Sequence, residues 1–582
     1  MRVPGLDGTR LAALLLGVSA AAAALIGMTL RRAGLRRRIQ HKTERGKQKR
    51  EAALAQMERA AQRFRRENPG VVPASILSLS LAELTRKLQD GSVSPESAVY
   101  TYMGKALEVH RDVNCLTDYL PECEAQLLEL KKEKRKGLLY GVPISIKDTY
   151  NYKGHDTTNG FVKLIDKPAS EDCVIIQVLK RQGAVPFVKT NVPQSLLNYD
   201  SSNLIFGQTL HPLNPTKTPG GSTGGEGALI SAGGSILGLG TDVGGSIRIP
   251  SSFCGICGLK PTGKRLSMSG NSTRSTTQNT VKRAFGPMAR DVDSLALFMR
   301  AVLCDEMFGL DPTVPPIHFN EEVYSSTRPL RVGYFETDGY TMPSPSMRRA
   351  VLEMKQLLEK AGHTLVEFAP PRMDFAFTEL AYQGMLSDGA STLLDKFKGE
   401  LTDPNLKAQI SFYRIPHPMK TFLSFITKPL FPRFSYICKS LRGFGSVKKL
   451  YEHHGDVEEY CLEFLRKWEG LNLDVMLCPA LCPAFGIGYP GKLMVSASYT
   501  ILYNLLDFPA GVVPVTTVTE RDEEELKHYK GYYKDTYDKL FREAVGGSVG
   551  LPVAVQCVAL PWQEELCLRF MKEVETMARE RN

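Results

Sequence analysis

The chain has 582 residues, of which 43% are hydrophobic and 23% charged, and a formal net charge of +11 at pH 7. This composition excludes a disordered chain, and the length suffices for one large α/β domain or two smaller ones. Residues 31–50 hold ten lysines and arginines and one glutamate, so they contribute +9 and the rest of the chain +2. These basic residues are confined to one segment, whereas a nucleic-acid-binding protein would normally spread them over a folded face. We therefore do not expect nucleic-acid binding.

An apolar segment without charged residues spans 11–30, after an N-terminal tail of residues 1–10. About 20 apolar residues are enough for a helix to cross a bilayer. A cleaved signal peptide is the alternative, but this run is longer than a typical signal core and the strongest positive charge follows it. We therefore predict a single transmembrane helix, and the positive residues after it place the folded body in the cytosol. A glycan on the sequon at Asn271 would contradict this orientation.

Residues 31–69 are predicted to form a basic juxtamembrane helical segment, a placement typical of contact with a membrane surface. Residues 70–575 follow as one folded domain, and 576–582 form a C-terminal tail. Within the domain, 81–112 contain two helical patterns separated by the turn-like residues 90–92.

Short apolar runs separated by helical patterns predict the strands of a sheet. They lie at 175–179, 185–188, 236–239, 330–335, 475–477 and 553–558. This alternation indicates an α/β fold with a mixed or mostly parallel sheet covered by helices.

Twelve cysteines form no recognisable disulfide framework, which is typical of a reducing compartment. Cys254 and Cys257 have zinc or redox spacing, and Cys478 with Cys482 could complete a four-cysteine site. The second spacing is looser, and apolar residues and prolines flank both pairs. We therefore interpret these cysteines as structural and expect no metal.

The loop 242–246, Asp-Val-Gly-Gly-Ser, directly follows a predicted strand. Two glycines before Ser246 permit positive φ angles, so successive N–H groups can converge on the oxyanion of a tetrahedral intermediate. An ordinary turn at the end of a strand is the alternative, and this loop alone does not decide between them.

A second glycine-rich loop, 219–227, contains Ser222. Its Gly-x-Ser-x-Gly pattern matches the nucleophile elbow of α/β-hydrolases, but an elbow requires a preceding hydrophobic strand. Residues 208–219 contain three prolines and no such strand, so we reject the elbow. A phosphate loop is also excluded, because no Gly-Lys-Ser/Thr follows the glycines.

Lys147 ends the largely apolar stretch 141–147. Burial would lower the pKa of its ammonium and make a neutral amine available as a base. The alternative is a lysine at the solvent-facing end of a strand, so the assignment depends on the two serines. None of the ten histidines lies in a comparable loop.

Residues 412–442 interleave aromatic and basic residues. Lys428, Pro429 and Pro432 interrupt the apolar run, so it suits an interfacial helical hairpin better than a membrane-spanning helix. A pair of core helices is the alternative.

The stretches around Lys147, Ser222 and Ser246 together resemble the amidase signature family. The match extends from about residue 70 to the C-terminus and includes further family motifs, at 258–263, 286–290 and 506–511. Vertebrate members that act on fatty acid amides are the most similar, through the N-terminal apolar segment and the stretches 191–196 and 550–561. The resemblance implies the family's fold, a large twisted mixed central sheet covered by helices, and it favours a membrane-binding cap at 412–442.

The resemblance also implies roles for individual residues. It makes Ser246 the acyl-accepting nucleophile, Ser222 a proton relay and Lys147 the base. The implied substrate contacts are Leu196, Ser222, Ser246 and the oxyanion-binding backbone of Val243, Gly244, Gly245 and Ser246. Asp242 and Arg248 are expected to support the loop. Thr223 and Leu196 depart from the pattern of many relatives but keep a hydroxyl and an apolar side chain.

The implied activity is hydrolysis of N-acylethanolamines such as anandamide and primary amides such as oleamide to fatty acid and amine, with esters as secondary substrates. No cofactor is implied, and a homodimer on the endoplasmic reticulum membrane is expected. Two alternatives stay open. A glutamine-amidase subunit for tRNA amidation would not need 11–30 or 412–442, and a catalytically silent lipid-binding scaffold would not need the two serines and the lysine.

Overall fold

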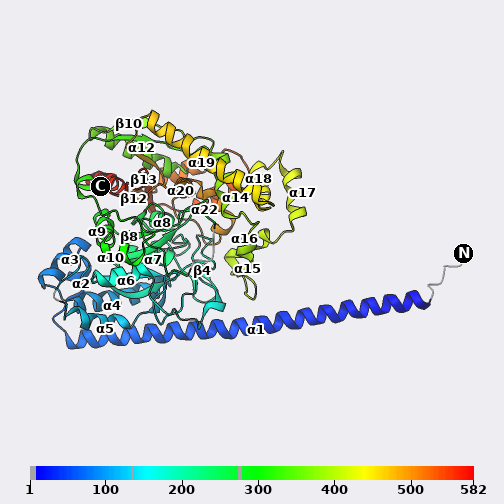
Figure 1. Cartoon of the computed structure of the whole chain (residues 1–582), viewed down its shortest axis with the longest axis horizontal. Coiled ribbons are helices and arrows are strands. Elements are labelled where there is room, and N and C mark those ends of the chain that lie inside the picture. The colour runs from blue at the N-terminus through cyan, green and yellow to red at the C-terminus, as the bar shows by residue number, and fades with distance from the viewer. Residues whose placement is uncertain (1–7, 134, 273–277, 582) are drawn as a thin grey trace.

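The computed structural model describes residues 8–133, 135–272 and 278–581, without the side chains of residues 8–11, 14, 17, 18, 21 and 24. Most of the predicted tail 1–10 therefore lies outside the described residues. Figure 1 shows a body built around one large sheet, with helix α1 (Gly8–Glu67) running along its edge and projecting far beyond it.

Within the described residues, eleven strands form a single sheet in the order β1-β3-β2-β6-β8-β7-β12-β13-β11-β9-β10. The strands are β1 (Leu116–Tyr119), β2 (Pro143–Lys147), β3 (Val185–Thr190), β6 (Leu237–Asp242), β7 (Cys257–Lys260), β8 (Ala284–Ala289), β9 (Arg331–Tyr334), β10 (Thr364–Glu367), β11 (Val475–Pro479), β12 (Ala510–Thr517) and β13 (Pro552–Val558). Strand β2 pairs in parallel with β3 and β6, and β9 pairs in parallel with β10 and β11, whereas the remaining pairs are antiparallel. The predicted mixed sheet is therefore confirmed.

Five of the six predicted strand segments coincide with strands β3, β6, β9, β11 and β13. The prediction for 175–179 is wrong, because this segment lies in helix α6 (Val174–Arg181). Val174, Ile175 and Val178 are buried on one side of that helix, while Gln177 and Lys180 are only partly buried. The short apolar run has the 3.6-residue period of a helix as well as the composition of a strand.

Helices cover the sheet as expected. The main ones are α3 (Leu81–Asp90), α4 (Pro95–Val113), α5 (Glu122–Leu130), α7 (Gly224–Ser231), α8 (Arg248–Cys254), α9 (Val292–Val302), α12 (Pro345–Lys360), α19 (Val447–Gly470), α20 (Ser498–Leu505), α22 (Thr536–Val545) and α23 (Glu564–Arg581). Helices α3 and α4 confirm the two patterns in 81–112, and Gly91 between them adopts a φ of 81°, which favours glycine. Helices α9 and α12 each contact α23 against the sheet, and α7 contacts α8.

The C-terminal part of α1 packs on α4 and β1 and buries Met57 and Ala60. The predicted membrane span 11–30 falls in the projecting part of α1, and several of its side chains lie outside the described residues. Among the described residues, no helix has both the length and the apolar character needed to cross a membrane.

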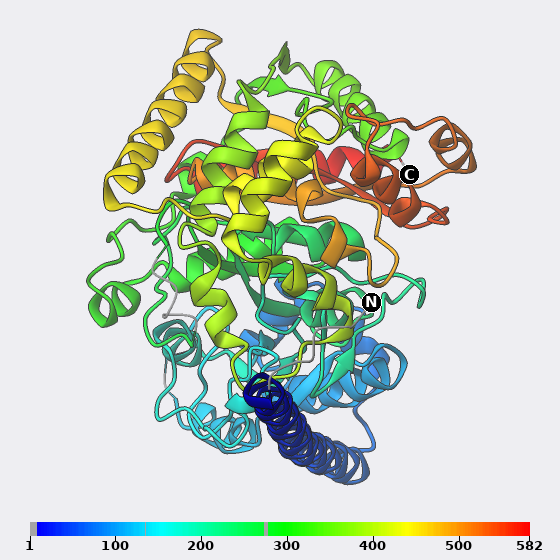
Figure 2. The same ribbon diagram turned by 90° about the vertical axis from the view of Figure 1, so that its right-hand side faces the viewer.

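The segment 412–442 forms a helical hairpin of α17 (His417–Thr427) and α18 (Pro432–Ser440), preceded by α16 (Lys407–Tyr413). Its outer surface carries exposed apolar side chains of Met419, Phe422, Phe425, Ile426, Leu430 and Phe431. Phe425 is 81% exposed, so the alternative of a buried core pair is wrong for α17. Figure 2 shows this hairpin and the projecting end of α1 on the same side of the molecule.

Candidate active site

Two neighbouring parallel strands bring the predicted site residues to one edge of the sheet. Lys147 is the last residue of β2, and β6 ends at Asp242, immediately before the glycine loop that leads to Ser246. Strands β2 and β6 pair in parallel, so their carboxyl ends lie together. This edge is where open α/β sheets commonly bind ligands.

Lys147 is fully buried, which excludes a lysine at a solvent-facing strand end. Its Nζ lies 2.7 Å from Ser222 Oγ and 2.8 Å from Thr241 Oγ1. Burial lowers the pKa of Lys147 to about 7, although the charges of Asp242 and Glu226 work in the opposite direction. A large share of this amine is therefore neutral at physiological pH.

Ser222 and Ser246 both line one cavity of about 420 Å³. The loop that carries Ser222 contacts the loop of Ser246, because the Thr223 N–H donates to the Ser246 carbonyl at 3.2 Å. The peptide bond between Gly221 and Ser222 is cis. A side chain at Gly225 would meet the backbone nitrogen of Asn191 at 2.3 Å, so this glycine permits close packing of the loop on β3.

The Asp242 carboxylate organises the turn before Ser246. It accepts hydrogen bonds from the Gly245 N–H at 2.8 Å and the Ile247 N–H at 3.1 Å, and from the Arg248 guanidinium at 3.0 Å. Burial opposes ionisation of Asp242, but Arg248 outweighs it and holds the pKa of this carboxyl well below its usual range. The loop-supporting role predicted for Asp242 and Arg248 agrees with these contacts.

This arrangement changes the prediction for one oxyanion donor. The Gly245 N–H is already bonded to Asp242, so it stabilises the turn in this structure. Gly245 has a φ of 123°, which lies in the region that favours glycine, and an added Cβ would meet Thr500 Oγ1 at 2.4 Å. The amides of Val243, Gly244 and Ser246 are the remaining candidates.

We expect Arg248→Met to destabilise the fold, because the substitution leaves the Asp242 carboxylate buried without its cation. Arg248 also donates to Thr500 and Gln556 and is fully buried. Loss of one partner of such a pair lowers the free energy of unfolding by roughly 3–5 kcal/mol.

Urea denaturation monitored by fluorescence measures this change. Arg521→Met is the matched control, since Arg521 pairs with Glu525 on the surface and the expected change is about 0–1 kcal/mol. Equal midpoints for the two variants would contradict the role assigned to Arg248.

The cavity at these strand ends is lined by both apolar and cationic side chains. Leu196, Leu197, Phe285, Met385, Leu386 and Leu393 supply apolar side chains, and Lys163, Arg283 and Lys396 supply cations. Leu196 adopts a φ of 65° and also lines an adjoining apolar pocket with Val243 and Gly244. The structure thus places Leu196, Ser222, Val243 and Ser246 around one cavity, a space suited to a ligand with an apolar chain. Lys147 bonds to Ser222 beside it, Gly244 lines the adjoining pocket, and Gly245 lines neither.

Two residues of the site were missed by sequence reasoning. Thr241 accepts a hydrogen bond from Lys147, and Glu226 accepts hydrogen bonds from the hydroxyls of Ser145 and Thr190. Glu226 is fully buried, and burial raises the pKa of its carboxyl to about 8. The signal for Glu226 was its position among glycines in 219–227, where a lone carboxylate has no local partner.

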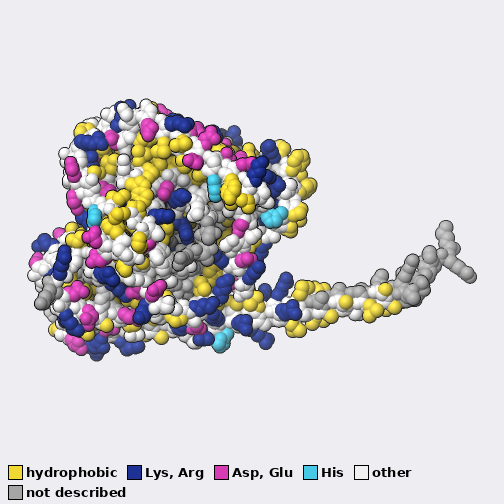
Figure 3. Space-filling model, viewed as in Figure 1, with side chains coloured by type: hydrophobic (Ala, Val, Ile, Leu, Met, Phe, Trp, Pro, Cys, Tyr) yellow, Lys and Arg dark blue, Asp and Glu magenta, His cyan; other side chains and the backbone are white. Residues whose placement is uncertain are grey.

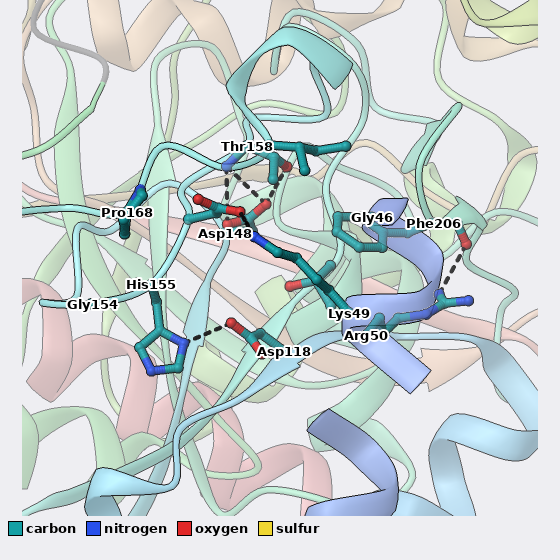
Figure 4. Close-up of a pocket in the computed structure, with 13 residues that line it drawn as sticks. Gly46, Lys49, Arg50, Asp118, Asp148, Gly154, His155, Thr158, Pro168 and Phe206 are labelled. Atoms are coloured by element: carbon teal, nitrogen blue, oxygen red, sulfur yellow. Dashed lines mark hydrogen bonds and ion pairs between the residues drawn. The ribbon is translucent and has the colours of Figure 1, made fainter. Parts of the chain in front are cut away.

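Another polar cavity lies beneath α1, and Figure 4 shows its lining. Its charged side chains are paired with one another or with neighbours: Lys49 with Asp156 at 3.2 Å, Asp148 with Lys189 at 2.9 Å, and His155 with Asp118 at 2.7 Å. Burial opposes protonation of His155, but the carboxylates of Asp118 and Glu122 raise its pKa to about 9. With these side chains paired, the polar cavity is a weaker candidate for the active site than the strand ends at Lys147.

The cysteine pairs are buried free thiols. Cys254 and Cys257 lie inside the core, as do Cys478 and Cys482, and burial raises the pKa of each thiol. Within the described part of the chain, no group of three or more His, Cys, Asp or Glu side chains has an arrangement that could hold a metal.

Comparison with known proteins gives three consistent findings. The family described as Amidase matches residues 97–568. The chain is 55% identical to Fatty-acid amide hydrolase 1 of Sus scrofa over 93% of both chains, and 58% identical to Vitamin D3 hydroxylase-associated protein of Gallus gallus over 74% of this chain and 93% of that protein. A solved fatty acid amide hydrolase superposes with a TM-score of 0.76 and 26% identity, covering 92% of this chain and 94% of the other.

Proposed function

Because the chain belongs to the amidase signature family and is an amidase, we propose that it hydrolyses long-chain fatty acid amides, both N-acylethanolamines and primary amides. The observation that carries this proposal is the buried Lys147 amine, 2.7 Å from Ser222 Oγ in the wall of a cavity that Ser246 shares. The names of one relative and of one solved structure, both fatty acid amide hydrolases, support the substrate class.

The first chemical step transfers two protons and forms one bond. Neutral Lys147 accepts the hydroxyl proton of Ser222, Ser222 accepts that of Ser246, and Ser246 Oγ attacks the amide carbonyl carbon. The 2.7 Å separation of Lys147 Nζ and Ser222 Oγ supports this transfer, because the two atoms lie within hydrogen-bond distance. The carbonyl oxygen becomes an oxyanion that the amides of Val243, Gly244 and Ser246 stabilise.

The second step breaks the carbon–nitrogen bond. The ammonium of Lys147 returns a proton through Ser222 to the departing nitrogen, so ammonia or ethanolamine leaves neutral and the acyl group stays on Ser246. Water then attacks the ester, with Lys147 and Ser222 accepting its proton, and free fatty acid is released. The same steps also cleave esters, and we therefore expect a secondary esterase activity.

The pH dependence of hydrolysis reports the state of Lys147. Because only the neutral amine accepts a proton, we expect kcat/KM for oleamide to fall about tenfold per pH unit below pH about 7 and to level off above it. Initial rates measured across this range check the prediction. A profile that stays level well below pH 7 would show that another group is the base.

Membrane attachment is the second part of the proposal. The apolar segment 11–30 acts as the anchor, and among its described side chains Leu15, Leu16, Leu25 and Ile26 are exposed to solvent. The cap 412–442 adds an apolar surface on the same side of the molecule. An enzyme placed this way takes its substrate from the bilayer. We assign it to the endoplasmic reticulum membrane, with its body in the cytosol and a homodimeric assembly.

We expect Phe422→Ser with Phe425→Ser to raise KM for oleamide held in lipid vesicles by about 100-fold or more, because each inserted phenylalanine contributes about 1.5–3 kcal/mol and the two together at least about 3 kcal/mol. Turnover of a water-soluble short-chain amide in detergent stays unchanged, since both residues lie outside the catalytic cavity. Leu128→Ser with Val549→Ser removes two exposed apolar side chains elsewhere and is the control. Equal effects of both double variants would contradict the role of the cap.

Hydrolysis of oleamide and of N-oleoylethanolamine by the full chain tests the proposed function. We expect release of oleic acid from both. Release of ammonia from glutamine without turnover of either lipid would identify a glutamine amidase. Absence of hydrolysis in folded, lipid-binding protein would identify a silent scaffold.

A further inference from the structure

A separate cavity of about 400 Å³ lies where α1 leaves the body, and we call it the α1 cavity. It lies between residues 35–45 of α1 and the segments around Val162 and Glu400. Its lining includes the cations Arg38, Lys42, Arg45 and Lys163 and the apolar side chains of Leu35 and Ile39. It therefore combines a basic wall with apolar side chains.

The cations of the α1 cavity exceed the anions that face them. Arg45 pairs with Asp166 at 2.8 Å, but Arg38, Lys42 and Lys163 form no ion pair with any acidic residue of the described chain. Lys42 Nζ donates only to the Lys163 carbonyl, at 3.1 Å. Lys163 Nζ donates to the Lys396 carbonyl, and Glu400 is the one carboxylate that shares the lining with these three cations.

The one carboxylate in the lining is already engaged. Glu400 accepts the backbone N–H groups of Val162 at 3.3 Å and Lys163 at 2.6 Å. Burial raises the pKa of Glu400, although its backbone hydrogen bonds and the charge of Lys163 work in the opposite direction. One carboxylate faces four cations in the lining, so the α1 cavity has an excess of positive charge that a bound anion would neutralise.

The apolar side of the α1 cavity is well packed. Ile39 is buried against Val162, Ile165 and Phe206, and Leu35 packs beside them. These contacts hold α1 against the body, and they place apolar side chains next to the cations of the α1 cavity. A ligand with a charged group and an apolar continuation matches both surfaces.

The position of the α1 cavity indicates which class of anionic ligand it binds. Figure 3 shows lysine and arginine side chains gathered where α1 leaves the body, next to the projecting part of the helix. The exposed face of α17 lies on the same side of the molecule. In the proposed membrane-attached enzyme, this region faces the polar headgroups of the cytosolic leaflet, where anionic lipids concentrate.

We propose that the α1 cavity binds the headgroup phosphate of an anionic phospholipid, with Arg38, Lys42 and Lys163 as its cationic contacts. This inference rests on the proposed membrane attachment. The lipid's glycerol and acyl portions continue along Leu35 toward the bilayer. Lys163 also lines the active-site cavity, so the bound lipid lies next to the substrate cavity and holds α1 against it.

Titration calorimetry of the full chain in neutral detergent tests the proposal, with a soluble short-chain phosphatidylserine as the ligand. We expect Arg38→Gln with Lys42→Gln to raise Kd roughly 25-fold and Lys163→Gln roughly 5-fold, from about 1 kcal/mol per cation. Arg37→Gln with Lys47→Gln is the matched control. Both residues are exposed cations of the same basic segment that do not line the cavity, so Kd stays unchanged.

Three results would overturn the proposal. Equal weakening by the control pair would show diffuse attraction to the basic segment. Equal affinity for short-chain phosphatidylcholine would show that the α1 cavity does not recognise the anionic headgroup. Equal affinity for inorganic phosphate would show that it does not recognise the glycerol and acyl portions of the lipid. Oleamide hydrolysis by the same samples separates the two proposals, because normal turnover without lipid selectivity refutes this inference alone.

Discussion

Ser246→Ala is expected to lower kcat for oleamide by on the order of a million-fold, because removal of the nucleophile from a coupled catalytic group eliminates covalent catalysis. Ser246 follows the turn organised by Asp242, and its side chain makes no structural contact that the variant would remove among those found in the described residues. Stability should therefore change little. Steady-state release of oleic acid measures the loss.

A matched serine variant separates chemistry from folding. Ser325→Ala removes a hydroxyl on the exposed surface, where it bonds only to the Glu321 carbonyl, and should keep full activity. Activity of Ser246→Ala within about tenfold of the wild type would remove Ser246 from the nucleophile role.

Lys147→Ala is expected to lower kcat/KM by roughly 10²–10⁴-fold, the usual contribution of a general base. Lys147→Arg gives the sharper result. The guanidinium keeps a positive charge and hydrogen-bond donors near Ser222 and Thr241, but it stays protonated at every accessible pH and cannot accept a proton. We therefore expect Lys147→Arg to be as inactive as Lys147→Ala.

The pair of variants distinguishes a base from a structural cation. If Lys147→Arg kept most of its activity while Lys147→Ala lost it, the residue would act by positioning Ser222 through charge. Hydrolysis rates at several pH values complete the test. If the decrease in rate below pH about 7 comes from protonation of Lys147, both variants should lack this decrease.

Parts of the site were predictable because their signals are local. Glycines on both sides of Ser222 and before Ser246 indicate close backbone approach whatever the fold around them. The burial of Lys147 was also indicated, by its apolar neighbours. The role of Thr241 was not, because its contact with Lys147 depends on the pairing of β2 with β6, which lie far apart in the sequence.

Some features of the fold could likewise be predicted from local sequence, and others depend on contacts that the local sequence does not specify. Helices α3 and α4 follow from their patterns and the glycine between them. The segment 175–179 was misassigned, because five residues of apolar composition do not distinguish a strand from a helical face. The bond from Gly245 to Asp242 likewise depends on the side-chain geometry of the turn, which a motif does not contain.

Activation of Ser246 by Lys147 through Ser222 can be tested by mass spectrometry of the full chain after reaction with a fluorophosphonate, which phosphorylates activated serine hydroxyls. We expect one adduct on Ser246 that forms rapidly in the wild type and much more slowly in Lys147→Ala. An adduct on a different serine, or none in folded protein, would contradict it.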